Sequence, residues 1–135
     1  MTRATAWSNG SKLGRVTYQG VVPSLDVLGG LTFNATDALS LNQSGSVSAS
    51  DCTTKNSGKI YCVSKDPVVK KKVTAVFKPT ATPGAFSFKV TMNKLEVPRP
   101  QAGPLAFEIN EGAGATYQGS NANCAANVKK LVCKN

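Results

Sequence analysis

Hydrophobic and polar residues alternate with a period of two along several short segments of the chain. In "GAFSFKVTMN" one face of an extended segment carries Phe86, Phe88, Val90 and Met92, and the other carries polar residues. This alternation is typical of a half-buried strand. "GPLAFEIN" repeats the pattern, and "KKVTAVFK" is rich in β-branched residues. No segment keeps a helical period, and Gly and Pro interrupt the chain at short intervals, so we expect an all-β fold.

The sequence also repeats itself. Residues 16–46 align with residues 90–120 without a gap and give seven identities in 31 positions, where ordinary composition would give roughly two. Beyond Ser46 the offset changes by a few residues, and "KIYC" then aligns with "KLVC". The alignment predicts two copies of a unit of about 72 residues, one in residues 1–64 and the other in residues 65–135.

Each unit has the strand content of a small β-sandwich. The strand count fits two small tandem antiparallel sandwiches or one two-part sandwich. The first unit has no counterpart of "SKDPVVKKKV", so we expect its opening strand to be short or supplied from elsewhere. The predicted strands are residues 3–7, 13–22, 30–36, 39–49 and 58–63 in the first unit, and residues 70–78, 85–95, 104–110, 114–121 and 128–134 in the second.

The four cysteines form two similar pairs, Cys52 with Cys62 and Cys124 with Cys133. Neither pair has the Cys-x-x-Cys spacing of zinc knuckles or thioredoxin-like sites. Across a hairpin with a polar turn, cysteines nine or ten positions apart can face each other, so we expect two structural disulfides rather than free thiols or a metal site. Each would stabilise its unit by about 2–3 kcal/mol and would indicate an oxidising compartment, which could be the periplasm, the cell surface or the medium.

The chain is basic, with 16 Lys and Arg against 7 Asp and Glu. The densest basic cluster comprises Lys65, Lys70, Lys71 and Lys72. It is a candidate contact for a polyanion such as nucleic acid, anionic lipid or acidic glycan. The alternative that we favour is a solvated strand edge protected by lysines. Since arginines and aromatic residues are not interleaved with the lysines, we do not expect nucleic acid as the partner.

The sequence contains no histidine, which excludes Ser-His and Cys-His catalytic pairs and histidine-ligated zinc. The carboxylates form no metal-binding run, so we expect no cofactor and no enzyme activity; catalysis would need scattered carboxylates, lysines or tyrosines. No stretch is apolar enough for a membrane span, and the first thirty residues lack the features of a signal peptide. We favour core packing or ordinary strand placement over a sugar-stacking platform for the candidate aromatic residues Trp7, Tyr18, Tyr61 and Tyr117.

The "FSFKV" strand, "GPLAFEI" and the closing "KLVCK" make each unit resemble the tandem immunoglobulin-like modules of large exported bacterial proteins. This resemblance implies a secreted, non-catalytic β-module that serves adhesion, spacing, surface assembly or ligand binding. We therefore expect an extracellular structural or interaction module. Its partners would be other protein chains or copies of itself, joined by β-strand addition at the incomplete first unit. The alternative is a polyanion- or carbohydrate-binding module.

Overall fold

The computed structural model describes residues 3–9, 12–39, 41–66, 71–95, 102–112, 114–121, 123–126 and 130–134. Across these residues the chain is almost entirely β-structure, with one short 3-10 helix, η1, at Ala49–Asp51. The strands are β1 (Arg3–Asn9), β2 (Lys12–Val22), β3 (Leu31–Thr36), β4 (Asn42–Val47), β5 (Cys52–Thr54), β6 (Ile60–Lys65), β7 (Lys72–Pro79), β8 (Phe86–Leu95), β9 (Leu105–Glu111), β10 (Thr116–Asn121), β11 (Asn123–Ala126) and β12 (Lys130–Lys134). The predicted all-β class is confirmed.

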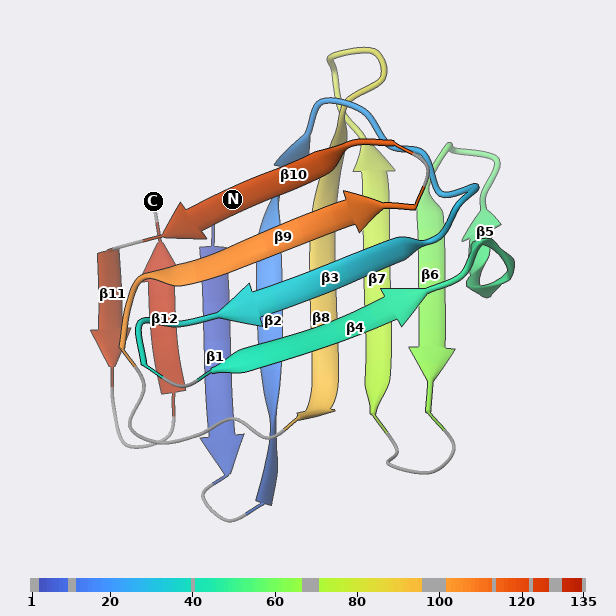
Figure 1. The fold of residues 1–135 in the computed structure, drawn as a ribbon. Coiled ribbons are helices and arrows are strands. Elements are labelled where there is room, and N and C mark those ends of the chain that lie inside the picture. The colour runs from blue at the N-terminus through green and yellow to red at the C-terminus, as the bar shows by residue number, and fades with distance from the viewer. Residues whose placement is uncertain are drawn as a thin grey trace.

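The strands form two antiparallel sheets that pack face to face. The larger sheet has eight strands in the order β11-β12-β1-β2-β8-β7-β6-β5, and the smaller has four in the order β10-β9-β3-β4. In Figure 1 the strands of the smaller sheet run across those of the larger one. Each sheet therefore has one face toward the other sheet and one face toward solvent.

The repeat in the sequence appears in the fold as an approximate two-fold symmetry. Both sheet orders are symmetric about their centres, where β2 pairs with β8 and β3 with β9. At the centre of the larger sheet Thr17 lies opposite Thr91, and at the centre of the smaller sheet Asn34 lies opposite Glu108. Both pairs are 74 positions apart, the offset of the sequence repeat. The symmetry axis therefore passes through these two residue pairs.

The two halves of the chain do not form two separate sandwiches. Each sheet takes strands from both halves, and the pairings β1–β12, β2–β8, β6–β7 and β3–β9 all join residues 1–64 to residues 65–135. The arrangement is the two-part sandwich. The physical reason lies in the strand order. In the larger sheet the strands of each half form two separate pairs, β1–β2 and β5–β6 or β7–β8 and β11–β12, and the other half supplies the strands between them, so only the two halves together form two continuous layers.

The opening strand of the first half also differs from expectation. β1 is seven residues long, and it pairs with β2 on one side and β12 on the other. The sheet position beside β2 that was expected to be incomplete is therefore filled by β1 from within the chain, and the C-terminal hairpin pairs with the other edge of β1.

Inward-facing side chains of both sheets form one core. Tyr18 is fully buried and stacks on Phe107, with the ring centroids 4.1 Å apart. Phe107 also packs against Phe33 and Phe88. The Tyr18 hydroxyl donates a hydrogen bond to the carbonyl oxygen of Ala106 at 3.2 Å, which satisfies the one polar atom of this buried ring.

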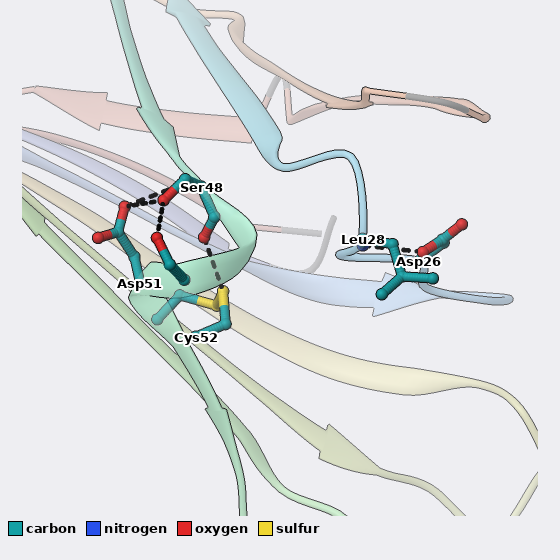
Figure 2. The surroundings of a disulfide bond; sticks show 7 residues. Asp26, Leu28, Ser48, Asp51 and Cys52 are labelled. Atoms are coloured by element: carbon teal, nitrogen blue, oxygen red, sulfur yellow. Dashed lines mark hydrogen bonds between the residues drawn. A yellow bond between two sulfur atoms is a disulfide. The ribbon is translucent and has the colours of Figure 1, made fainter.

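Both predicted disulfides are present. Cys52 is bonded to Cys62 across the β5–β6 hairpin and Cys124 to Cys133 across β11–β12, each pair lying directly opposite in the ladder. Figure 2 shows the turn beside Cys52, where the Asp51 carboxylate accepts hydrogen bonds from the Ser48 backbone N–H at 2.8 Å and from its hydroxyl at 3.0 Å. These contacts close the short helix that leads from β4 into the hairpin.

Candidate functional site

Charge is separated between the two layers of the sandwich. Every described lysine and arginine belongs to a strand of the eight-stranded sheet or to a loop joining two of its strands, and β3, β4, β9 and β10 contain none. No described Asp or Glu lies on a strand of the eight-stranded sheet. This sheet therefore carries a positive field with no opposing charge on its own strands.

The basic side chains point away from the core. Most of them alternate with buried residues along their strands, as Lys89 does with Phe88 and Val90, and alternation places them on the outer surface of the sheet. We call this surface, carried by β1, β2, β6, β7, β8 and β12, the basic face. Lys94 on β8 is exposed but lies at a register shift, with φ +57°, and breaks the alternation. The exposed basic residues that follow the alternation are Arg15, Lys65, Lys72, Lys78, Lys89 and Lys134.

The ladder registers arrange the basic face in rows that cross the strands. The central row consists of four adjacent threonines, Thr74, Thr91, Thr17 and Thr5. One neighbouring row contains Lys65, Lys72, Asn93 and Arg15 in that order. With adjacent strands about 4.8 Å apart, this row spans about 14 Å. The basic face is thus a polar strip with positive charge along its border.

Within that row, Lys65 and Lys72 lie directly opposite each other on β6 and β7. Like charges at directly opposed positions destabilise a sheet. No described carboxylate lies on these strands themselves, although Asp66 follows Lys65 directly in the turn between them.

The predicted cluster of four lysines is divided by the fold. Lys65 and Lys72 contribute to the basic face, whereas the Lys71 ammonium donates a hydrogen bond to the Ser44 carbonyl oxygen of β4. Lys70 lies outside the described residues. Sequence reasoning missed Arg15, Lys78 and Lys89, which are far from the cluster along the chain. The alternation of these residues with apolar neighbours in the sequence indicates that they face outward. The sequence does not indicate the order of the strands, which brings them onto the same face.

The outer face of the smaller sheet has a different chemistry. The Glu108 carboxylate accepts hydrogen bonds from the side-chain amides of Asn110 at 2.6 Å, Gln118 at 2.7 Å and Asn34 at 3.3 Å. The bonds from Asn110 and then Gln118 contribute most to lowering the pKa of Glu108, with a smaller contribution from Asn34. The carboxylate is thus ionised and already engaged by neighbouring amides.

The candidate aromatic residues do not form one platform. Tyr18 belongs to the core. Tyr117 packs partly against the core, and its hydroxyl lies 2.6 Å from that of Ser24. Tyr61 is 39% exposed on β6, while the side chain of Trp7 lies outside the described part of the structure. Core packing was the correct interpretation for Tyr18.

Within the described ranges, no group of three or more His, Cys, Asp or Glu residues could hold a metal ion. Among the same residues, no helix has the length and apolarity needed to cross a membrane. The chain matches no family model, no curated protein and no solved structure. The resemblance to immunoglobulin-like modules therefore stays a prediction.

Proposed function

We propose that the protein is a non-catalytic extracellular interaction module that binds a linear polyanion on the basic face. The observation that carries this proposal is the separation of charge by layer. Lysines scattered for solubility would occur on both outer faces. Here all the charged residues on the described strands of the larger sheet are basic, and the strands of the smaller sheet carry no basic residue. The two disulfides fit an oxidising compartment, which favours an acidic polysaccharide over nucleic acid as the polymer.

The geometry suits a polymer better than a compact ligand. The row from Lys65 to Arg15 crosses four strands, so successive acidic groups of an extended chain could each meet a basic side chain. Individual exposed ion pairs contribute only about 0.2–1 kcal/mol. Useful affinity would therefore come from several contacts at once, and it would fall steeply as salt is added.

Assembly by β-strand addition, the other interaction mode expected from the sequence, has less support from the geometry. The expected vacancy beside β2 is occupied by β1. The edge strands of the larger sheet, β5 and β11, are only three and four residues long. On β4, an edge strand of the smaller sheet, the Ser44 carbonyl accepts from Lys71. Short strands and lysines of this kind discourage edge pairing.

Binding can be tested by the salt concentration at which the protein elutes from immobilised heparin. The double variant Arg15→Gln/Lys72→Gln removes two positive charges from the basic face. The control Thr32→Glu/Asn42→Glu changes the net charge equally, but at exposed positions of the smaller sheet. Circular dichroism would verify that both variants fold.

We expect the wild type to be retained, the basic-face variant to elute at clearly lower salt, and the control to elute close to the wild type. Removing two contacts should also lower the slope of log affinity against log salt by roughly two, the value known for nucleic-acid polyanions. Equal shifts for both variants would mean that only net charge matters. That result, or a wild type that is not retained, would refute the proposal.

A further inference from the structure

A shallow groove lies at one end of the basic face, away from the Lys72–Arg15 row. It has a volume of ≈ 510 Å³, and Lys59, Lys78 and Lys89 line it together with Gln19, Ser87, Val21 and Val76. The ladder registers explain how these residues meet: Lys78 and Val21 both lie opposite Ser87, and Val76 and Gln19 both lie opposite Lys89. The groove therefore spans β7, β8 and β2.

The lining combines three kinds of contact. Three ammonium groups surround the groove, and no carboxylate lines it. The Ser87 hydroxyl and the Gln19 amide supply uncharged hydrogen-bonding groups. Val21 is 56% exposed, and Val76 lies beside Tyr61, which is 39% exposed. Apolar surface thus lies beside three lysines in the same groove.

Lys59 reaches the groove from the turn between β5 and β6. Its carbonyl oxygen accepts the Lys55 N–H at 2.8 Å, and the Cys52–Cys62 disulfide closes the hairpin that carries this turn. Gly58, with φ +86°, lies where a Cβ atom would come within 2.9 Å of Pro79. The turn is therefore fixed against the end of β7, next to Lys78, and the disulfide helps to hold Lys59 in place.

We propose that this groove binds a single acidic sugar unit, carrying a carboxylate or sulfate group, of the polysaccharide that follows the basic face. The ammonium groups would neutralise the acidic substituent, Ser87 and Gln19 would bond the ring hydroxyls, and the C–H face of the ring would cover Val21 and Val76. A small inorganic anion would use the charges and leave the apolar surface exposed. A sugar ring can use both, because its hydroxyl and acidic groups bond the polar side chains while its C–H face covers the apolar ones. This inference rests on the proposed function.

The test compares a heparin-derived tetrasaccharide with inorganic sulfate and a neutral cello-oligosaccharide, using calorimetry and methyl chemical shifts. The groove variant is Lys59→Gln/Lys78→Gln, and the matched control is Arg15→Gln/Lys72→Gln, which removes the same charge from the same face. We expect the groove variant to weaken tetrasaccharide binding about tenfold and the control to weaken it about threefold or less. The Val21 methyl shifts should move with the tetrasaccharide.

Val21→Ser separates a sugar site from a simple anion site. It should weaken tetrasaccharide binding while leaving the weak response to sulfate unchanged, and the neutral oligosaccharide should not bind. Equal losses from the groove variant and the control, or an unchanged affinity in Val21→Ser, would overturn the sugar site. If either of these results is obtained while heparin still retains the wild type more strongly than the Arg15→Gln/Lys72→Gln variant, only the groove inference fails. If the wild type is not retained at all, the proposed function fails with it.

Discussion

Tyr18 should make the protein lose stability in alkaline solution. Its ring is fully buried between the sheets, and its hydroxyl donates to the Ala106 carbonyl oxygen. Burial, and to a smaller extent the negative charge of Asp37, raise the pKa of Tyr18 well above the ordinary value of 10.0. In the unfolded chain the same hydroxyl ionises near pH 10. Above that pH the unfolded state therefore releases a proton that the folded state retains.

The sign and size of the effect follow from proton linkage. Because the folded state binds more protons above pH 10, the free energy of unfolding falls as the pH rises through the interval between the unfolded and folded pKa values. The contribution of Tyr18 is fully present at neutral pH. About 0.4 kcal/mol of it is lost at pH 10 and about 1.4 kcal/mol at pH 11, with a limiting slope of about 1.4 kcal/mol per pH unit.

Urea unfolding followed by circular dichroism at pH 8 and pH 11 would measure this loss. The Tyr18→Phe variant should be about 1 kcal/mol less stable than the wild type at pH 8, because one buried hydrogen bond is removed. It should then lose about 1.4 kcal/mol less than the wild type between pH 8 and pH 11. The control Tyr61→Phe, at an exposed position, should retain the full alkaline loss. If wild type and Tyr18→Phe lose the same amount, Tyr18 is not the buried group described here.

Three further predictions concern the architecture. Replacing Cys52 and Cys62 by alanine should cost about 2–3 kcal/mol in urea unfolding, because the bridge closes a loop between residues 10 positions apart; an unchanged midpoint would contradict this. The two halves of the chain, expressed separately, should each lack stable β-structure by circular dichroism, because both central strand pairs join one half to the other. The β-structure should return when the halves are mixed. A half that folds alone would show that the predicted separate sandwich is accessible. Gly112→Ala should cost about 1–3 kcal/mol, because the added Cβ atom would lie 2.0 Å from the backbone oxygen of Gly29. Gly114→Ala, which meets the flexible Glu111 side chain at 3.1 Å, should cost less when measured in the same way.

The local features of the fold were predictable from the sequence. The alternation of Phe86, Phe88 and Val90 located β8, and the cysteine spacing located both hairpins. These signals are local, because a strand has a period of two and a short hairpin brings its ends together. The predicted strand 39–49 was too long. Its first part is a turn in which an Asp37 carboxylate oxygen accepts from the N–H groups of Leu39 and Leu41, each at 2.9 Å.

The pairing between the halves could not be read in the same way. The two repeats have similar patterns of apolar and polar positions, and this pattern is the same whether a strand pairs within its own half or with the other half. The choice depends on which arrangement buries more apolar area overall. For the same reason, the sequence showed Lys65 and Lys72 as neighbours in a cluster but did not place Arg15 in their row, two strands away from Lys72.

The repeat itself provides the strongest argument that the charge separation has a function. Arg15 on β2 corresponds to Lys89 on β8, and both are exposed and basic. On the smaller sheet, Asn34 on β3 corresponds to Glu108 on β9, and neither copy has a basic residue on these strands. Most outward positions differ between the copies, as Thr32 and Ala106 or Ser44 and Gln118 do. The placement of basic residues on one layer is nevertheless common to both copies, and solubility alone would not assign it to one layer. The proposed contact with a negatively charged partner on one face would account for it.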